Sequence, residues 1–293
     1  MMPVPLVTYR NFFKNICITL DNVLCLFFYA AMQTLFTFAT EKRLPEILDR
    51  LQAVYGKARQ GESDPLSQLV FCVVGEKTAG ALALASFHRL RQEFVRWSDI
   101  RDADPDDLVP SLRGIADHAR KAKLLPQILR QIEARHGLLE LDFLADWPIE
   151  AAQKWLQELP GVSAAAAAAT LNFSSLRKTI LSVDHDSARP LRRMALVPAG
   201  APLSALDRHI GENLPFQWGA REARSLHDGL ARLGRNICHQ GRPDCKHCPL
   251  NDLCPTAKRG SAKVLTFPQK KPVAEKEKTK ARALPEKWEP VFG

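Results

Sequence analysis

The sequence lacks the alternation of apolar and polar residues that marks β-strands. From Leu44 onward no segment shows a convincing period of two, which argues against a sheet-based fold. It also lacks the polar composition of a disordered chain, because 46% of its 293 residues are hydrophobic. That length and content suit one large domain or two smaller ones with a real core.

Acidic residues are in the minority. The chain has 41 Lys and Arg residues against 32 Asp and Glu, a formal net charge of +9, and a pI near 9.3. Such a charge favours a polyanionic partner, and nucleic acid is the first choice. Membrane surfaces and acidic proteins also attract basic chains, so charge alone leaves these alternatives open.

Helical periodicity fills the middle of the chain. Leu, Ile and Val recur at three- and four-residue spacings through residues 44–51 and 66–73, which predicts helices and an all-α body. Asp64, directly before Pro65, and Ser111 are the expected helix starts, because both side chains can accept a backbone N–H. Breaks in the pattern are expected at Pro65, Pro105, Pro110, Pro148 and Pro160–Gly161.

Both ends differ from this body. Residues 16–39 are apolar and follow Arg10 and Lys14, which is typical of a signal peptide or a marginal membrane span. We favour a third interpretation, a start codon assigned too far upstream with Met32 as the first residue. After Thr256 the chain holds ten basic and four acidic residues and predicts a flexible tail. The tail is either an electrostatic arm for phosphates or a solubilising end.

Seven cysteines divide into two groups. Cys17, Cys25 and Cys72 are scattered in apolar surroundings and are interpreted as buried thiols. The other four have the spacing CX6CX2CX5C, which suits an iron–sulfur cluster or zinc, with two disulfides a weaker alternative. The long gaps favour the cluster, since structural zinc sites usually pair two short CXXC steps. These four are Cys238, Cys245, Cys248 and Cys254.

A Pro-Gly turn separates two helical stretches. Residues 159–163 lie between expected helices at 149–158 and 164–172, which predicts a helix-hairpin-helix. A tight turn of this kind exposes backbone N–H groups at the start of the second helix. Those groups and the helix dipole attract a phosphate without reading sequence.

These features together resemble a known family. The cysteine spacing, with Gly234 and Arg235 before it and Pro255 after it, is similar to the C-terminal cluster loop of the endonuclease III family of helix-hairpin-helix DNA glycosylases. The segment 183–189 resembles that family's motif with a catalytic aspartate and a following arginine. Residues 115–122 resemble its helix before the hairpin, with Ala116 in place of an expected glycine.

The resemblance implies an all-α fold with two helical subdomains. A helical barrel is expected over about 64–176, and a cluster subdomain from 41–63 together with 177–257. The glycosylase domain would thus span 41–257, between an N-terminal extension at 1–40 and the basic tail at 258–293. The resemblance also implies a four-iron, four-sulfur cluster on the four cysteines, with zinc as the alternative.

The implied activity is base excision from double-stranded DNA with a damaged or mismatched base. Asp184 matches the catalytic aspartate, which would stabilise positive charge on the deoxyribose or activate water once the base is rotated out. Without the resemblance Asp184 would be a helix N-cap, and we expect Asp186 to take that role. The expected DNA contacts are Pro160, Gly161, Val162, Ser163, Lys77, Arg189, Arg242 and Lys246, with Arg235 and His247 adding positive charge nearby.

The chain departs from the family pattern at informative positions. Bifunctional members have a lysine four residues after the hairpin glycine that forms a Schiff base and cuts the strand, and here that residue is Ala165. A monofunctional glycosylase without lyase activity follows. Lys77 stands where the family has a glutamine-containing turn that fills the gap left by the base. Adenine-excising relatives need a glutamate just before this turn, and this chain has Cys72 nearby instead. Adenine opposite oxidised guanine is therefore a poor substrate prediction.

A second function stays open. The missing lysine and the altered turn at Lys77 also fit a non-catalytic iron–sulfur protein that binds DNA or senses damage. For either function we expect a monomer without an obligatory protein partner in the cytoplasm, in bacterial cytosol or nucleoid. Anchoring to a membrane by the first forty residues is the alternative location. No sequence feature predicts the lesion.

Overall fold

The computed structural model describes residues 41–58, 63–198 and 200–261. Within these ranges every regular element is a helix, so the all-α prediction is confirmed there. The first described helix covers residues 41–55. The others are α3 (Pro65–Gly75), α4 (Gly80–Glu93), α5 (Trp97–Asp102), α6 (Pro105–Leu112), α7 (His118–His136), η1 (Asp142–Asp146), α8 (Ile149–Gln157), α9 (Ala164–Phe173), α10 (His185–Arg193), η2 (Leu203–Ala205), α11 (Leu206–Gly211), α12 (Ala220–Asn236), η3 (Cys245–His247) and α13 (Pro255–Ser261).

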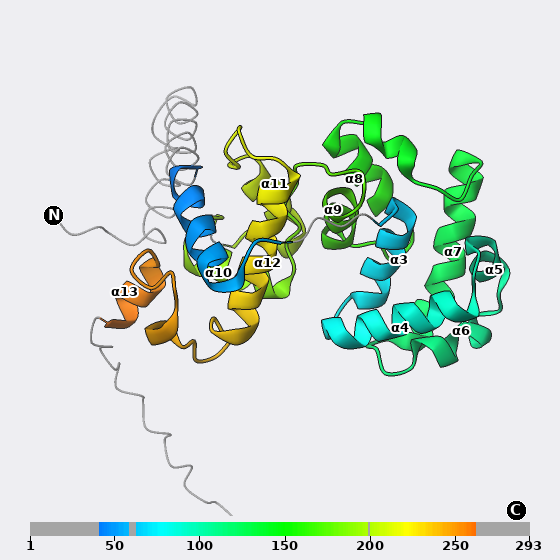
Figure 1. Ribbon diagram of the computed structural model, residues 1–293, viewed down its shortest axis with the longest axis horizontal. Helices are drawn as coiled ribbons and strands as arrows, with labels where there is room; N and C mark the ends of the chain where they lie inside the picture. Colours follow the sequence, from blue (N-terminus) through cyan, green and yellow to red (C-terminus); the bar gives the residue numbers. More distant parts are fainter. Residues whose placement is uncertain (1–40, 59–62, 199, 262–293) are drawn as a thin grey trace, which may run out of the picture.

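The helices form two lobes, each around its own core (Figure 1). The first core draws its buried apolar side chains from Leu66 to Ile180, most of them on α3 to α9. The second takes them from Leu44–Leu51 and from Leu181–Leu250, so the first described helix packs with the C-terminal half. Burial of these apolar faces, not helix propensity, is the main source of stability in short helices.

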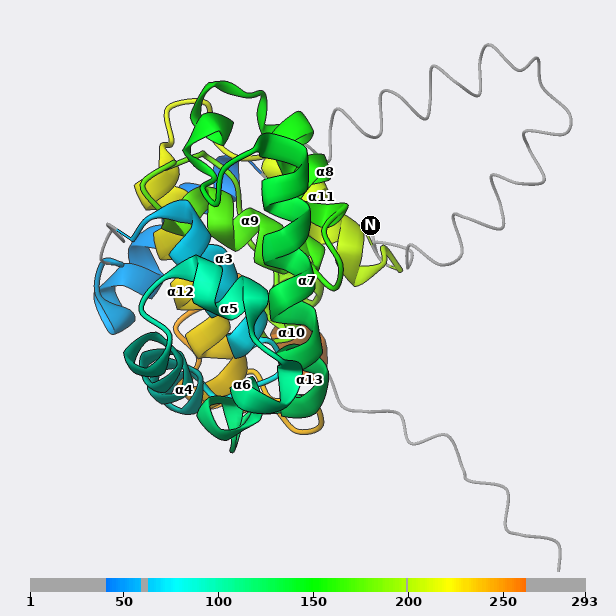
Figure 2. The same ribbon diagram turned by 90° about the vertical axis from the view of Figure 1, so that its right-hand side faces the viewer.

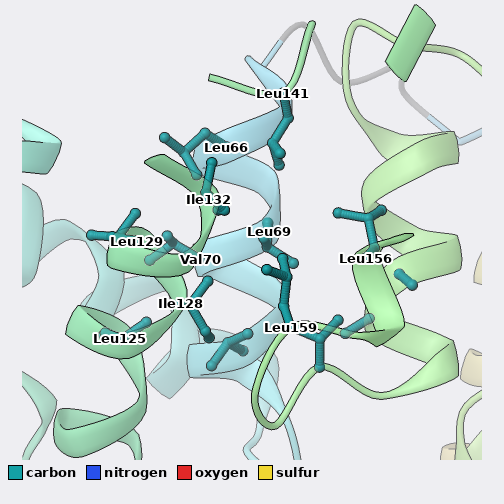
Figure 3. Close-up of a cluster of buried hydrophobic side chains, with 14 of the residues drawn as sticks. Leu66, Leu69, Val70, Leu125, Ile128, Leu129, Ile132, Leu141, Leu156 and Leu159 are labelled. Atoms are coloured by element: carbon teal, nitrogen blue, oxygen red, sulfur yellow. The ribbon is translucent and has the colours of Figure 1, made fainter. Parts of the chain in front are cut away.

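Leucine and isoleucine fill the first core. Figure 3 shows side chains of α3, α7 and α8 converging on one another between the three helices. The ten labelled residues, Leu66, Leu69, Val70, Leu125, Ile128, Leu129, Ile132, Leu141, Leu156 and Leu159, are almost completely buried. α9 completes this lobe by packing against α3 and α8, which fixes the start of α9 beside the end of α3.

Polar contacts tie the first described helix to the C-terminal loop. Arg43 donates from Nη1 to the carbonyl of Met194 and from Nη2 to that of Leu253, each at 3.1 Å. Arg50 bonds the carbonyl of Pro249 at 3.3 Å and pairs with Asp252. Two parts of the chain about two hundred residues apart are thereby joined within the second lobe.

α9 also contacts the second lobe. It packs against α11 and α12 of the second lobe, and Figure 2, with α4 to α7 toward the viewer, places it among the inner helices. Asn172 donates from Nδ2 to the carbonyls of Lys178 and Ala220, at 2.8 and 3.0 Å. The residues at the start of α9 and those between α9 and α10 therefore lie at the boundary of the two cores.

One of the two predicted helix starts is confirmed. Asp64 caps α3 by accepting the N–H of Ser67 at 2.8 Å. The prediction for Ser111 is wrong, because Ser111 lies buried inside α6. That helix begins earlier, where Asp104 precedes Pro105 and accepts the N–H of Asp106 at 2.9 Å.

Among the described residues, none of the helices has the length and apolar character needed to span a membrane. The predictions for the apolar segment 16–39, for Met32 and for most of the basic tail fall outside the described residues. The segment 115–122, predicted as a helix, instead straddles a turn and the beginning of α7 at His118.

Candidate active site

Asp184 is the N-cap of α10. Its Oδ1 accepts hydrogen bonds from the backbone N–H and the hydroxyl of Ser187, both at 2.7 Å. The Ser187 hydroxyl in turn accepts the N–H of Asp184 at 2.9 Å, which completes a capping box. The expectation that Asp186 is the cap is therefore wrong. Asp186 lies in the first turn and pairs with Arg189 and Arg235.

The charge of this carboxylate is held by its surroundings. Burial by itself would raise the pKa of Asp184, but His227, the hydrogen bonds from Ser187 and the charge of Arg235 outweigh it, and the pKa is below its ordinary value. Asp184 is thus an anion at neutral pH. No described residue donates a hydrogen bond to its Oδ2, which leaves that oxygen for a substrate or water.

A cavity of about 1070 Å³ opens beside Asp184. Both lobes contribute to its wall, since the turn after α3 and the first half of α9 face the segment 182–186 and residues of α12. The lining includes Phe71, Cys72, Gly75, Glu76, Lys77, Thr78, Ser163, Ala164, Ala165, Ala166, Ala169, Phe173, Ser182, Asp184, His227 and Arg235. This volume suffices for a nucleobase with part of its sugar.

Ala165 shares this cavity with Asp184. The two segments are fastened together, because Ser182 Oγ donates to the carbonyl of Ala165 at 3.0 Å. The small side chains of α9 leave the space beside the carboxylate open. Ala165, where the family resemblance places the lysine of bifunctional members, thus lines the same cavity as the carboxylate and offers it only a methyl group.

The hairpin turn directly precedes the residues of α9 that line the cavity. Its flanking helices, Ile149–Gln157 and Ala164–Phe173, agree with the predicted ranges to within one residue. Gly161 has φ +72°, a conformation that favours glycine, and a Cβ there would lie 2.7 Å from Leu124 Cδ1, so the Leu124 side chain would have to move. Val162 points inward, and its N–H donates to Leu159.

Open backbone donors remain at this turn. No described residue accepts a hydrogen bond from the N–H groups of Gly161, Ser163 or Ala164. Ser163 is the N-cap of α9 and accepts the N–H of Ala166 at 3.1 Å. These donors at a helix N-terminus can bind a phosphate oxygen.

Lys77 extends from the turn between α3 and α4, which we call the plug turn, residues 76–79. Its backbone is left-handed at φ +57°, and its side chain is 62% exposed and 4.0 Å from Asp117. Lys77 lines both the cavity with Asp184 and a smaller hollow of about 290 Å³ beside Gly161 and Ser163. Lysine, hairpin and carboxylate thus occupy one continuous surface.

The four cysteines gather in the loop after α12, residues 238–254, which we call the cluster loop. Burial and the nearby thiols of Cys254 and Cys238 raise the pKa of Cys245, and the other three thiols also raise that of Cys248. Arg193 donates to Cys238 Sγ at 3.1 Å. Among the described residues no three Cys, His, Asp or Glu side chains are grouped as they would be around a single metal ion.

Basic residues near the cluster loop differ in whether they bond the protein or are exposed. The Arg189 guanidinium donates hydrogen bonds within the protein, to Asp186 and to the carbonyls of His185, Gly234 and Cys238. Arg242 and Lys246 are exposed. His247 is exposed and pairs with Asp244 at 2.6 Å.

Three residues near the site were not found by sequence reasoning. Ser187 had a signal, since an acceptor three residues after Asp184 is the spacing of a capping box. His227 had none, because it reaches the cavity from α12 and bonds the Ser182 carbonyl through Nδ1 at 2.8 Å. Lys121 lies in the segment 115–122, whose resemblance to the family gives it no role, and its side chain is buried beneath the plug turn.

Comparison with models of known protein families gives no match. Curated relatives are distant. Thymine-DNA glycosylase of Aeropyrum pernix is 24% identical over 201 residues, 66% of this chain and 82% of that protein. DNA glycosylase/AP lyase ROS1 of Arabidopsis thaliana is 22% identical over 179 residues, 57% of this chain and 13% of that protein. The chain spans only 10% of Protein ROS1C of Oryza sativa, a further plant relative.

Solved structures agree over more of the chain. A non-covalent endonuclease III–DNA complex superposes with a TM-score of 0.63 at 20% identity, covering 76% of this chain and 99% of that one. A thermostable thymine-DNA glycosylase gives 0.59 at 18% identity, covering 76% and 99%. The helices, the hairpin and these similarities show that the chain has the fold of the endonuclease III-like superfamily of helix-hairpin-helix DNA glycosylases.

Proposed function

We propose that the protein is a monofunctional DNA glycosylase of base-excision repair. The observation that carries the proposal is that the ionised Asp184 and the amine-free Ala165 line one cavity between the hairpin and the plug turn. The carboxylate stabilises the positive charge that develops on the deoxyribose as the N-glycosidic bond breaks. Water completes the reaction, since α9 offers no amine for a Schiff base.

Double-stranded DNA is the proposed partner. The open N–H groups at Gly161 and Ser163 bind a backbone phosphate on one side of the cavity. Lys77 enters the gap that the rotated base leaves in the duplex. Arg242 and Lys246 on the cluster loop add phosphate contacts. Arg189, with its donors engaged inside the protein, positions α10 against the cluster loop.

The cysteines fit a four-iron, four-sulfur cluster as the proposed cofactor. The thiols of Cys238 and Cys254 lie close enough to those of Cys245 and Cys248 to raise the pKa of both, and four neighbouring cysteine thiols are the ligand set of such a cluster. Cys238, Cys245, Cys248 and Cys254 would hold it. When bound, the cluster supplies a structural cross-link that fixes the loop bearing Arg242 and Lys246.

A lesion panel tests the proposed reaction. Duplexes with uracil, thymine opposite guanine, oxidised pyrimidines or alkylated bases are incubated with the protein, and strand breaks are compared with and without hot alkali. We expect breaks only after alkali, on at least one lesion. Breaks without alkali would contradict the absence of a lyase step. Binding without breaks on every lesion would favour the non-catalytic DNA-binding alternative.

A further inference from the structure

A buried lysine holds the turn that carries Lys77. Lys121, in the first turns of α7, is only 5% exposed. Its ammonium donates to the carbonyls of Val74 at 2.8 Å and Glu76 at 2.7 Å. The last carbonyls of a helix lack partners within the helix, so Lys121 satisfies those at the end of α3.

Thr78 extends this contact across the plug turn. Its hydroxyl donates to the carbonyl of Glu76 at 3.2 Å and accepts the N–H of Ala116 at 3.2 Å. The Lys121 ammonium lies 3.4 Å from the same oxygen. One hydroxyl and one ammonium therefore connect the plug turn to the beginning of α7.

The turn needs this restraint because its geometry is unfavourable. Lys77 is left-handed at φ +57°, a conformation that is unfavourable for any residue with a Cβ atom. A relaxed turn would redirect the Lys77 side chain. Burying a lysine is also costly, and desolvation lowers the pKa of Lys121 against the opposing charges of Glu76 and Asp117. Packing alone would be served better by an apolar residue of similar size.

We propose that Lys121 is a positioning residue that fixes the plug turn and so directs Lys77 into the duplex. The inference rests on the proposed function, since it takes Lys77 as the residue that fills the gap left by the base. Lys121 itself does not contact DNA or the reacting atoms, because its ammonium is spent on the carbonyls beneath the turn.

Base release from two substrates tests the role. Lys121→Met keeps the volume and removes the hydrogen bonds, and Lys123→Met on the exposed side of α7 is the matched control. On a fully paired duplex we expect Lys121→Met to slow release at least tenfold. The loss should be small when the target base faces an abasic linker and is already unpaired. Equal losses on both substrates, or none, would overturn the proposal.

A double variant and a milder change refine this test. On the paired duplex, Lys77→Ala should slow base release about as much as Lys121→Met does. The double variant should be no slower than either single variant. Additive losses would show independent roles and overturn the proposal. If Lys121→Met fails to fold, Thr78→Val removes the hydroxyl with little change of shape, and Thr78→Ser restores it. The same paired-duplex defect is expected for valine and not for serine.

Hydrogen exchange of the free protein separates this inference from the proposed function. The Thr78 N–H donates to the Gly75 carbonyl at 3.0 Å. We expect Lys121→Met to speed its exchange at least tenfold, while Lys123→Met leaves it unchanged. Unchanged exchange in Lys121→Met would overturn the positioning role whatever the enzymology. Faster exchange in a protein that releases no base would support the restraint and refute only the proposed function.

Discussion

At the scale of single residues, Asp184 combines a structural role with a proposed chemical one. One carboxylate oxygen caps α10 through Ser187, and the other is open toward the cavity. Asparagine also caps helices well, whereas alanine does not. The two duties can therefore be separated by substitution.

Replacement of Asp184 by Asn should remove activity without removing the cap. We expect base release to fall at least a hundredfold, the usual size of a lost electrostatic or acid–base contribution, with DNA binding retained. The melting temperature should stay close to that of the wild type. Asp184→Ala should lose the same activity and about 1 kcal/mol of stability as well. Single-turnover excision at pH 7 and thermal unfolding measure the two effects, and an active Asp184→Asn would refute the catalytic assignment.

Ala165→Lys places an amine where α9 now offers none. Because Ala165 lines the cavity with Asp184, we expect the variant to form a Schiff base with the abasic sugar and to cut the strand without alkali. Borohydride reduction should trap the covalent complex. Ala165→Arg is the control, since it adds charge and bulk but no nucleophile of this kind. Trapping by the wild-type protein would show that another amine already acts as a lyase nucleophile.

Residue identities were predictable where a short spacing carries the chemistry. The four cysteines lie within seventeen residues and the Asp184 segment within seven, so the sequence alone names both as candidates. His227 and Lys121 could not be found in this way, because their contacts with Ser182 and Val74 join separate helices. Asp186 was mistaken for the cap because two carboxylates lie two residues apart, and only the hydrogen bonds to Ser187 distinguish them.

At the scale of elements, the hairpin turn depends on one glycine. Gly161→Ala meets a left-handed backbone and the Leu124 side chain, so we expect a loss of about 1 to 3 kcal/mol and weaker DNA binding. The double change Gly161→Ala with Leu124→Ala makes room but keeps the strain of the backbone. Thermal unfolding and binding at one fixed salt concentration should show only partial recovery. Full recovery would mean that space alone, without conformation, requires the glycine.

The crossing of α10 and α12 depends on a second glycine. A Cβ at Gly234 would lie 2.1 Å from the Asp186 carbonyl oxygen, which belongs to the backbone and cannot rotate away. We expect Gly234→Ala to cost about 3 kcal/mol or more. Gly229→Ala on the same helix meets the Leu51 side chain at 2.8 Å and should cost less. Urea unfolding of the pair measures the difference, and equal losses would contradict this reading of the crossing.

Several element boundaries followed local signals. The hairpin helices and the Asp64 cap were predictable because proline, glycine and capping residues act within a few positions. Ser111 failed because Asp104 before Pro105 is the stronger start, and Pro110 is tolerated near the end of α6. The sequence alone does not tell which of two candidate helix starts is used, because tertiary packing decides between them.

At the scale of the whole molecule, the proposed cluster fixes the loop that carries Arg242 and Lys246. Cys245→Ser should remove the brown colour and visible absorption of a four-iron, four-sulfur cluster. We expect DNA affinity to fall about tenfold and its salt dependence to flatten, because Arg242 and Lys246 lose their placement. Circular dichroism should still report the helices of the first lobe, whose core contains no residue of this loop. A colourless wild-type protein containing zinc would refute the cluster.

The two-lobe arrangement was expected from family resemblance, not from periodicity, because hydrophobic patterns do not say which helices share a core. The joining of residues 44–51 with the C-terminal half is a contact between distant segments. The lesion stays unpredicted for the same reason, since the cavity wall is assembled from both lobes.

The site is divided between two cores, and this division has a consequence for how such proteins diversify. Asp184 follows Val183 of the second core, while Phe71, Cys72 and Ala169 belong to helices of the first. Mutations in α3 and α9 can reshape the part of the wall proposed to meet the base, while Asp184 keeps its place on the second lobe. A new substrate preference can then arise from mutations in the first lobe, while selection on the second lobe retains Asp184.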